Sequence, residues 1–231
     1  MYHRVWPGIS DGLTITPDRL REQWLYLKKE GYNALSMQEF LNAITDKIPY
    51  PEKSILLTFD DGYKNNLSHV YPLLKELNWK ATFFIIADTL DKTKEETDIN
   101  QKMNLEELKT LDPSVVQLGV HGFHHEHFSD LNNDEIKQVI TQSIEAFEKN
   151  NLPYCKVLAY PYGGRPKNKA QFNALKTWMK ATGIEAAFRI GNKVAQIPAK
   201  DIYEIKRIDI KGTDTMSDFK IKLKKGKLKP F

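Results

Sequence analysis

Two adjacent carboxylates constrain this chain more than any other feature. Asp60 and Asp61 directly follow a short apolar run, residues 54–59, and Gly62 comes next. A short apolar run that ends in a turn residue is typical of a buried strand. Neighbouring carboxylates repel each other, and a bound cation would relieve that repulsion. A solvated Asp-Asp-Gly turn explains the same letters equally well, so both interpretations stay open at this point.

Candidate strands and helices alternate along all 231 residues. Such alternation is typical of parallel strands joined by helical crossovers, and it fits either a barrel or a doubly wound sheet. No glycine-rich phosphate loop follows the early strands, which disfavours a nucleotide-binding sheet. We therefore expect one α/β domain over 1–231, with a basic tail from about residue 220.

Three candidate strands end in unusual residues. The first ends at Asp60-Asp61, the second runs into the histidine-rich segment 121–127, and the third runs into Pro161-Tyr162-Gly163. The carboxyl ends of parallel strands meet on one face of such a fold. These three segments are therefore expected to form one site.

The histidine-rich segment suggests metal binding. His121 and His125 are four residues apart, so on a helical turn they would share a face and bind one ion. One Asp and two His leave open coordination positions, as a catalytic site requires. The second Asp would then be free to act as a general base in the hydrolysis of an ester or amide. The backbone N–H of Tyr162, after Pro161, is a candidate oxyanion donor.

These motifs together resemble the polysaccharide deacetylases, carbohydrate esterase family four. The resemblance rests on Thr-Phe-Asp-Asp-Gly at 58–62, His-x-x-x-His at 121–125 and Tyr-Pro-Tyr-Gly at 160–163, and it extends from Met1 to about Ile210. It implies a distorted (β/α) barrel with fewer than eight strands and removal of N-acetyl groups from amino sugars, usually with zinc. By position it implies these roles: Asp60 as the catalytic base, Tyr162 as the oxyanion donor, and Asp61, His121 and His125 as metal ligands.

The chain departs from that family at three places. Gly122 stands where the family commonly has Ser or Thr, and Ala159 stands where it often has an Arg that keeps the catalytic Asp charged. Arg165, Arg189 or Arg207 could substitute, and we favour Arg207. No histidine follows His127 to act as the late general acid, which leaves three alternatives besides a metal-bound water: His3, His124 and His127.

Composition bears on the cellular location of the protein and on three further kinds of feature: disulfides, cysteine metal clusters and nucleic-acid binding. No leader-like segment follows Met1, so a cytoplasmic location is expected if Met1 is the native start. The single Cys155 excludes an internal disulfide and a cysteine metal cluster. Six lysines between 220 and 229 are expected to form a solvated, partly helical end, and few aromatic residues accompany them, which disfavours nucleic-acid binding.

Three functional hypotheses follow. The leading one is a hydrolase that uses one divalent metal ion, with zinc as the expected ion, to remove N-acetyl groups from an amino-sugar glycan or its precursor. The second is a metal-dependent amidase for a non-sugar amide. The third is a glycan-binding protein with impaired catalysis, which is motivated by the absent late histidine and by Ala159.

Overall fold

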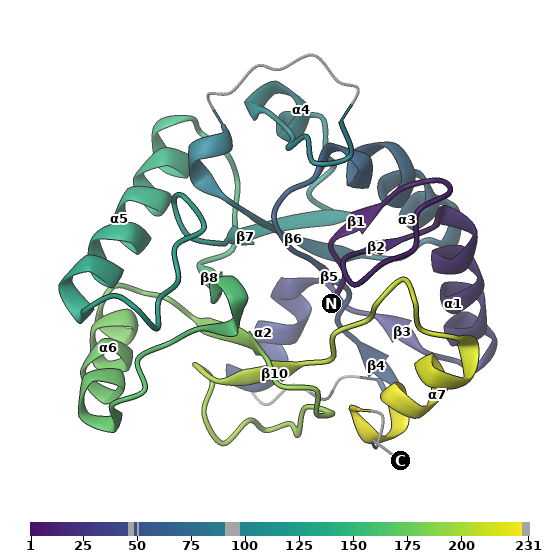
Figure 1. Ribbon diagram of the computed structural model, residues 1–231. Helices are drawn as coiled ribbons and strands as arrows, with labels where there is room; N and C mark the ends of the chain where they lie inside the picture. Colours follow the sequence, from purple (N-terminus) through teal and green to yellow (C-terminus); the bar gives the residue numbers. More distant parts are fainter. Residues whose placement is uncertain (46–48, 50, 91–97, 228–231) are drawn as a thin grey trace.

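A curled six-stranded parallel sheet forms the centre of the molecule (Figure 1). The computed structural model describes residues 1–45, 49, 51–90 and 98–227. The sheet order is β10-β9-β8-β7-β6-β5, and every neighbouring pair is parallel. This confirms an α/β fold with fewer strands than a full barrel. The strands are β5 (Thr58–Phe59), β6 (Ala81–Ile85), β7 (Val116–Val120), β8 (Val157–Ala159), β9 (Ala186–Ile190) and β10 (Ile205–Arg207).

Helices flank the curled sheet, most of them on its outer side (Figure 1). Their starts follow local rules: the Thr16 hydroxyl accepts a hydrogen bond from the Arg19 N–H at 3.3 Å at the first helix, and Pro17 occupies its first position. The α-helices are α1 (Pro17–Lys29), α2 (Met37–Thr45), α3 (Tyr71–Leu77), α4 (Leu105–Lys109), α5 (Asn133–Lys149), α6 (Lys169–Ala181) and α7 (Met216–Lys225). Three shorter helical segments are η1 (Asn66–Val70), η2 (Ala87–Thr89) and η3 (Pro161–Gly163).

The sequence predicts one strand for the apolar run before the two aspartates, and this prediction is wrong. The run is divided into β4 (Ser54–Ile55) and β5, which lie in different sheets. β4 pairs with β3 (Asn33–Ala34), and a second small parallel pair joins β1 (Arg4–Val5) to β2 (Thr14–Ile15). The chain therefore changes partners just before it reaches Asp60.

The N-terminal residues bridge the two edges of the curled sheet. Tyr2 N–H donates to Thr58 O at 2.9 Å, and Asp60 N–H donates back to Tyr2 O at 3.0 Å. On the other side, Ile210 N–H donates to Met1 O at 3.1 Å. Met1 and Tyr2 therefore lie between β5 and the segment that follows β10, and His3 emerges beside the Asp-Asp turn.

The packing inside the sheet is tight. Phe83, Phe84 and Val157 are buried completely. Gly119, on β7, has no space for a side chain, because a Cβ there would lie 2.7 Å from Phe84 Cε1 and 2.9 Å from Val157 Cγ2. The strands that carry the site are thus held by a core with little room to adjust.

The lysine-rich end is partly helical, as expected, but it is not simply solvated. Lys222, on α7, is only 6% exposed; its Nζ donates to Asp209 O at 2.9 Å and pairs with Asp214. This lysine anchors α7 to the segment after β10, whereas Lys229 lies outside the described residues. Among the residues that the structure describes, no helix is both long and apolar enough to cross a membrane.

Candidate active site

The backbone of the Asp-Asp turn has an unusual conformation. Asp61 and Gly62 both have left-handed backbones, with φ of 73° and 68°. Side chains rarely adopt this conformation, which glycine adopts freely, so the turn favours glycine at position 62. A Cβ at Gly62 would also lie 2.9 Å from Ile85 Cδ1, so the turn is pressed against β6.

The histidine segment is an irregular loop rather than a helical turn. His121 follows β7 directly, and the loop turns through left-handed conformations at Gly122 (φ 79°) and His125 (φ 64°). A Cβ at Gly122 would lie 3.0 Å from Glu126 Oε2, and that carboxylate accepts a hydrogen bond from the Phe123 N–H at 3.1 Å. Glu126 thus supports the loop beside Gly122.

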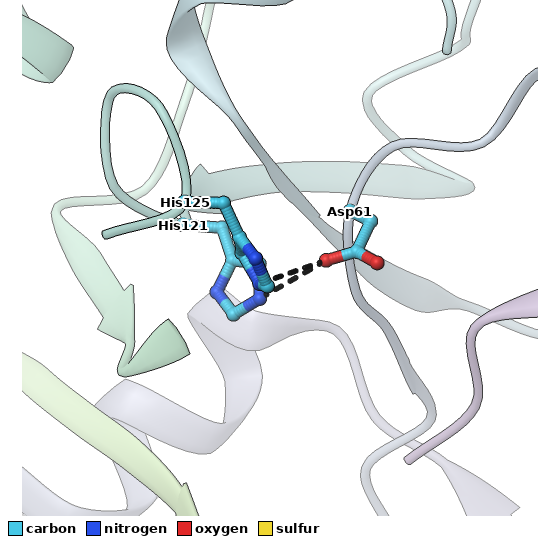
Figure 2. Close-up of side chains that lie close together, drawn as sticks. All are labelled: Asp61, His121 and His125. Carbon is cyan, nitrogen blue, oxygen red and sulfur yellow. Dashed lines mark ion pairs between the residues drawn. The ribbon is translucent and has the colours of Figure 1, made fainter. Parts of the chain in front are cut away.

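Asp61, His121 and His125 nevertheless converge, as Figure 2 shows. Asp61 Oδ1 lies 3.3 Å from His121 Nε2 and 3.3 Å from His125 Nε2. One ligand atom from each of the three residues lies within 4.8 Å of the others, which is close enough to hold one metal ion. The sequence-predicted ligand set is therefore brought together.

The chemistry of these atoms fits a cation. His121 Nδ1 lies 2.8 Å from Ala159 O, and since a carbonyl can only accept, this nitrogen carries the proton and Nε2 presents a lone pair in the neutral ring. Asp61 Oδ1 is buried and has no hydrogen-bond partner among the described residues. Lone pairs of the Asp61 carboxylate and of the imidazoles thus face one another, at separations that leave room for a metal ion. A cation between them would stabilise this arrangement.

The titration of Asp61 and His125 favours ligand forms, whereas the lowering of the His121 pKa by burial is outweighed by the carboxylates of Asp60 and Asp61, which raise that pKa. Burial opposes ionisation of Asp61, but the adjacent His121 ring and the charge of Lys102 hold the pKa of the carboxyl well below its ordinary value. Burial, followed by the positive charge of His121, lowers the pKa of His125 to about 4. At neutral pH Asp61 is therefore ionised and His125 is neutral, as metal ligands must be.

Asp60 is paired with Arg207 in a buried, bidentate contact. Arg207 Nη1 donates to Asp60 Oδ1 at 2.7 Å and Nη2 donates to Oδ2 at 2.6 Å; Asp60 is 3% exposed and Arg207 7%. Burial alone would raise the pKa of Asp60, but the guanidinium and the nearby His121 outweigh it and lower the pKa. Asp60 is thus kept as a carboxylate 3.9 Å from His121 Nε2, measured from Oδ2.

The other two candidate arginines lie elsewhere. Arg165 and Arg189 both pair with Glu204, the latter through Nη1 at 3.0 Å. Ala159, which stands at the family's arginine position, contributes its carbonyl to His121 instead. Of the three candidates, Arg207 is the one that contacts Asp60.

The Pro161–Gly163 turn lies against the histidines. Tyr162 has a left-handed backbone (φ 56°) and is 55% exposed; its ring stacks on His127 with centroids 3.6 Å apart and lies 4.3 Å from that of His125. The N–H groups of the next two residues close the turn, at 2.9 Å onto Tyr160 O and 2.9 Å onto Pro161 O. The turn therefore brings Tyr162 beside the candidate ligand His125.

The three histidines considered as general acids lie in different surroundings. His3 has a buried Nδ1 with no hydrogen-bond partner among the described residues, and burial lowers its pKa against the opposing charges of Asp60 and Asp61. His124 has a side chain that is 65% exposed and pairs with Asp88 at 2.9 Å. His127 is stacked on Tyr162.

Lys102 belongs to the site, although the sequence analysis does not identify it. Its Nζ lies 3.6 Å from Asp61 Oδ2 and 3.1 Å from the centre of the Tyr63 ring. Burial lowers its pKa to about 8 despite the nearby Asp61 carboxylate. Lys102 lies in a polar stretch without a regular pattern, so no sequence signal marks it; only the pairing of this stretch with residues 62–64 brings it to the site.

Comparisons with known proteins agree with the geometry. A sequence profile described as "Polysaccharide deacetylase" matches residues 47–184, more than half of the chain. Bacillus subtilis YxkH is 26% identical over 163 residues, which cover 71% of this chain and 55% of YxkH. Staphylococcus epidermidis poly-β-1,6-N-acetyl-D-glucosamine N-deacetylase is 27% identical over 208 residues, covering 84% of this chain and 67% of that protein.

A solved structure shares the fold. IcaB from Ammonifex degensii superposes with a TM-score of 0.77 at 20% identity, over 98% of this chain and 95% of that one. At that identity the similarity establishes the curled α/β architecture alone. The chain spans about half the length of YxkH, so it corresponds to only part of that relative.

Proposed function

The chain belongs to the polysaccharide deacetylase family, and from this premise we propose that it is a metal-dependent hydrolase that removes N-acetyl groups from an amino-sugar glycan or its precursor. One observation carries the proposal: a carboxylate held ionised by a buried arginine lies beside an Asp-His-His cluster that could hold a metal. A general base next to an electrophile is what amide hydrolysis requires.

The ligands would be Asp61, His121 and His125, which offer one oxygen and two imidazole nitrogens. Zinc is the ion we propose, because this donor set suits it and leaves a coordination position open. When bound, such an ion polarises the acetyl carbonyl and makes water more acidic.

The chain's own side chains and backbone would then transfer two protons and stabilise the negative charge that develops on the carbonyl oxygen. Asp60 takes the proton of the attacking water, while Arg207 keeps Asp60 ionised before the reaction. The Tyr162 N–H donates to the carbonyl oxygen as it gains negative charge. His3 donates a proton to the leaving nitrogen; its proximity to both aspartates, whose charges oppose the lowering of its pKa by burial, supports this role over the exposed His124 and the stacked His127.

The proton-donor assignment can be tested with paired substrates. An amide nitrogen needs protonation before it leaves, whereas an aryl ester such as 4-nitrophenyl acetate has a leaving group that departs without it. His3→Asn should therefore slow amide hydrolysis by at least about a hundredfold while slowing ester hydrolysis much less. Equal losses on both substrates would exclude His3 as the proton donor, and a matched His124→Asn variant should leave both rates near those of the parent chain.

The function itself is tested by acetate release from a panel of substrates in the presence of zinc. The S. epidermidis relative makes poly-β-1,6-N-acetylglucosamine the first polymer to include, and chitooligosaccharides and an N-acetyl-lysine peptide complete the panel. Release from a glycan alone supports the proposal, whereas release from the peptide alone would indicate the amidase. Glycan binding without turnover by the zinc-loaded chain would indicate a binding protein.

A further inference from the structure

The segment that carries Lys102 is attached to the Asp-Asp turn by its backbone. Lys102 forms an antiparallel bridge with Tyr63. Lys64 N–H donates to Gln101 O at 2.8 Å, and Met103 N–H donates to Gly62 O at 2.8 Å. Met103 is buried completely, so the two residues on either side of Lys102 are held in place. The position of the Lys102 side chain is therefore set by the same turn that carries Asp61.

The ammonium group of Lys102 lies on the outer side of the Asp61 carboxylate. Nζ is 3.6 Å from Oδ2, whereas the other oxygen, Oδ1, faces the Nε2 atoms of His121 and His125. Nζ also lies over the face of the Tyr63 ring, where a cation is attracted to the ring's negative face. Only 22% of the Lys102 side chain is exposed, so water screens this charge poorly. One carboxylate thus stands between a fixed cation and the place that a metal would take.

The charges of the site balance once both candidate histidine ligands are neutral. Asp60 is paired with Arg207, and Asp61 is paired with Lys102. With His121 and His125 neutral as ligands, the two carboxylates and the two basic groups sum to no net charge. A dication therefore enters a neutral site rather than a negative one, and it shares the Asp61 carboxylate with an ammonium group.

We propose that Lys102 tunes the metal site through its charge: held against Asp61 Oδ2, its ammonium group makes a bound divalent cation more weakly held and more electrophilic. The inference rests on the proposed function, since it concerns the metal of that site. Removal of Lys102 should therefore change metal affinity and turnover in opposite directions: it should tighten metal binding and slow turnover. A role in merely orienting Asp61 would instead weaken binding and slow turnover together.

The test measures metal affinity and turnover separately in the full chain. Metal is removed with a chelator, and zinc and cobalt are titrated back in competition with a chromophoric chelator at pH 7. A unit charge about 6 Å from a dication changes its affinity about tenfold even at the dielectric constant of bulk water. Lys102→Met should therefore bind zinc about tenfold or more tightly, while its kcat at saturating zinc falls by at least about threefold.

Two variants make the result specific. Lys102→Arg retains the charge and should keep both the zinc affinity and the kcat of the parent chain. Lys64→Met removes a lysine from the same backbone pairing, but that lysine forms an ion pair with Glu107 at 2.9 Å, so zinc affinity should stay within about twofold. Lys102→Gln serves as a second neutral variant if Lys102→Met does not fold.

The outcomes separate this inference from the function on which it rests. If the parent chain binds no divalent metal, the metal-dependent function itself fails. If the parent chain binds zinc but the neutral Lys102 variants bind it with equal or lower affinity, the function stands and the charge-tuning role is refuted. Tighter binding with unchanged kcat would also refute the claim that Lys102 makes the ion more electrophilic.

Discussion

Removal of Arg207 should change stability and catalysis through one contact. Arg207→Met deletes two charge-assisted hydrogen bonds to Asp60, of 2.7 and 2.6 Å, and leaves that carboxylate buried without its partner. Breaking such a buried pair costs about 3–5 kcal/mol of unfolding free energy. The same loss removes the main influence that lowers the pKa of Asp60, while the burial that raises it remains. We therefore expect a less stable protein whose base ionises only at higher pH.

The pH dependence has a definite sign. Because the pKa of folded Asp60 lies below its ordinary value of 3.8, the pair contributes its full stability above that pH and loses it as the pH falls further. In Arg207→Met this contribution is absent, and the acid limb of kcat/KM should move up by about 1–3 pH units, the effect of one adjacent arginine on a carboxyl group. Urea unfolding and a pH-rate profile with saturating zinc measure the two effects.

A double variant separates the loss of the pair from general damage. Asp60→Asn combined with Arg207→Met leaves neither charge buried alone, so it should be more stable than Arg207→Met by about 2 kcal/mol or more. As a control, Arg165→Met removes a partly exposed arginine that shares Glu204 with Arg189, and it should cost about 1 kcal/mol or less. An acid limb that stays in place in Arg207→Met would refute the assignment of Arg207 as the group that keeps the base ionised.

Three further variants, the last with a matched control, test the site and the core of the sheet. Asp61→Ala removes the ligand between the two imidazoles and should weaken zinc binding at least about a hundredfold in a chelator competition, whereas unchanged affinity would exclude Asp61 as a ligand. Asp60→Asn should lower kcat by about 10²–10⁴-fold with zinc still bound, and full activity would show that another group is the base. Gly119→Ala should lower the unfolding free energy by about 1–3 kcal/mol, because its Cβ would lie 2.7 Å from Phe84. Gly12→Ala, where a Cβ meets nothing within 4 Å, should change it by no more than about 0.5 kcal/mol.

The sequence identifies the parts of the site that follow strands. Asp61, His121 and Tyr162 lie at or near the carboxyl ends of β5, β7 and β8, and parallel strands bring such ends together whatever the loops do. Local backbone geometry is harder to predict. The histidine pair lies on an irregular loop rather than on a helical turn, and left-handed residues at Gly122 and His125 bring the rings together by another path.

The sequence analysis misses what depends on contacts between distant segments. Lys102 has no pattern of its own and reaches Asp61 only because its segment pairs with residues 62–64. Lys222 looks like one more solvated lysine, yet it is buried against Asp214. The division of residues 54–59 between two sheets is equally invisible in the sequence, since each of the two strands has one hydroxyl residue followed by one apolar residue. Each miss is a case in which tertiary partners, rather than local preference, decide the conformation.

The position of Arg207 shows how the incomplete barrel and the chemistry are connected. β5 and β10 are the two edges of the curled sheet, and the Asp60–Arg207 pair joins the turn after β5 to the end of β10. Since an ionised base requires only a guanidinium within reach of Asp60, the strand that supplies it can change. In this chain the edge strand supplies it, while the position before Tyr160 needs only the Ala159 carbonyl that orients His121. The Asp60–Arg207 contact therefore also joins the two edges of the sheet, so its loss should loosen the site and the fold together.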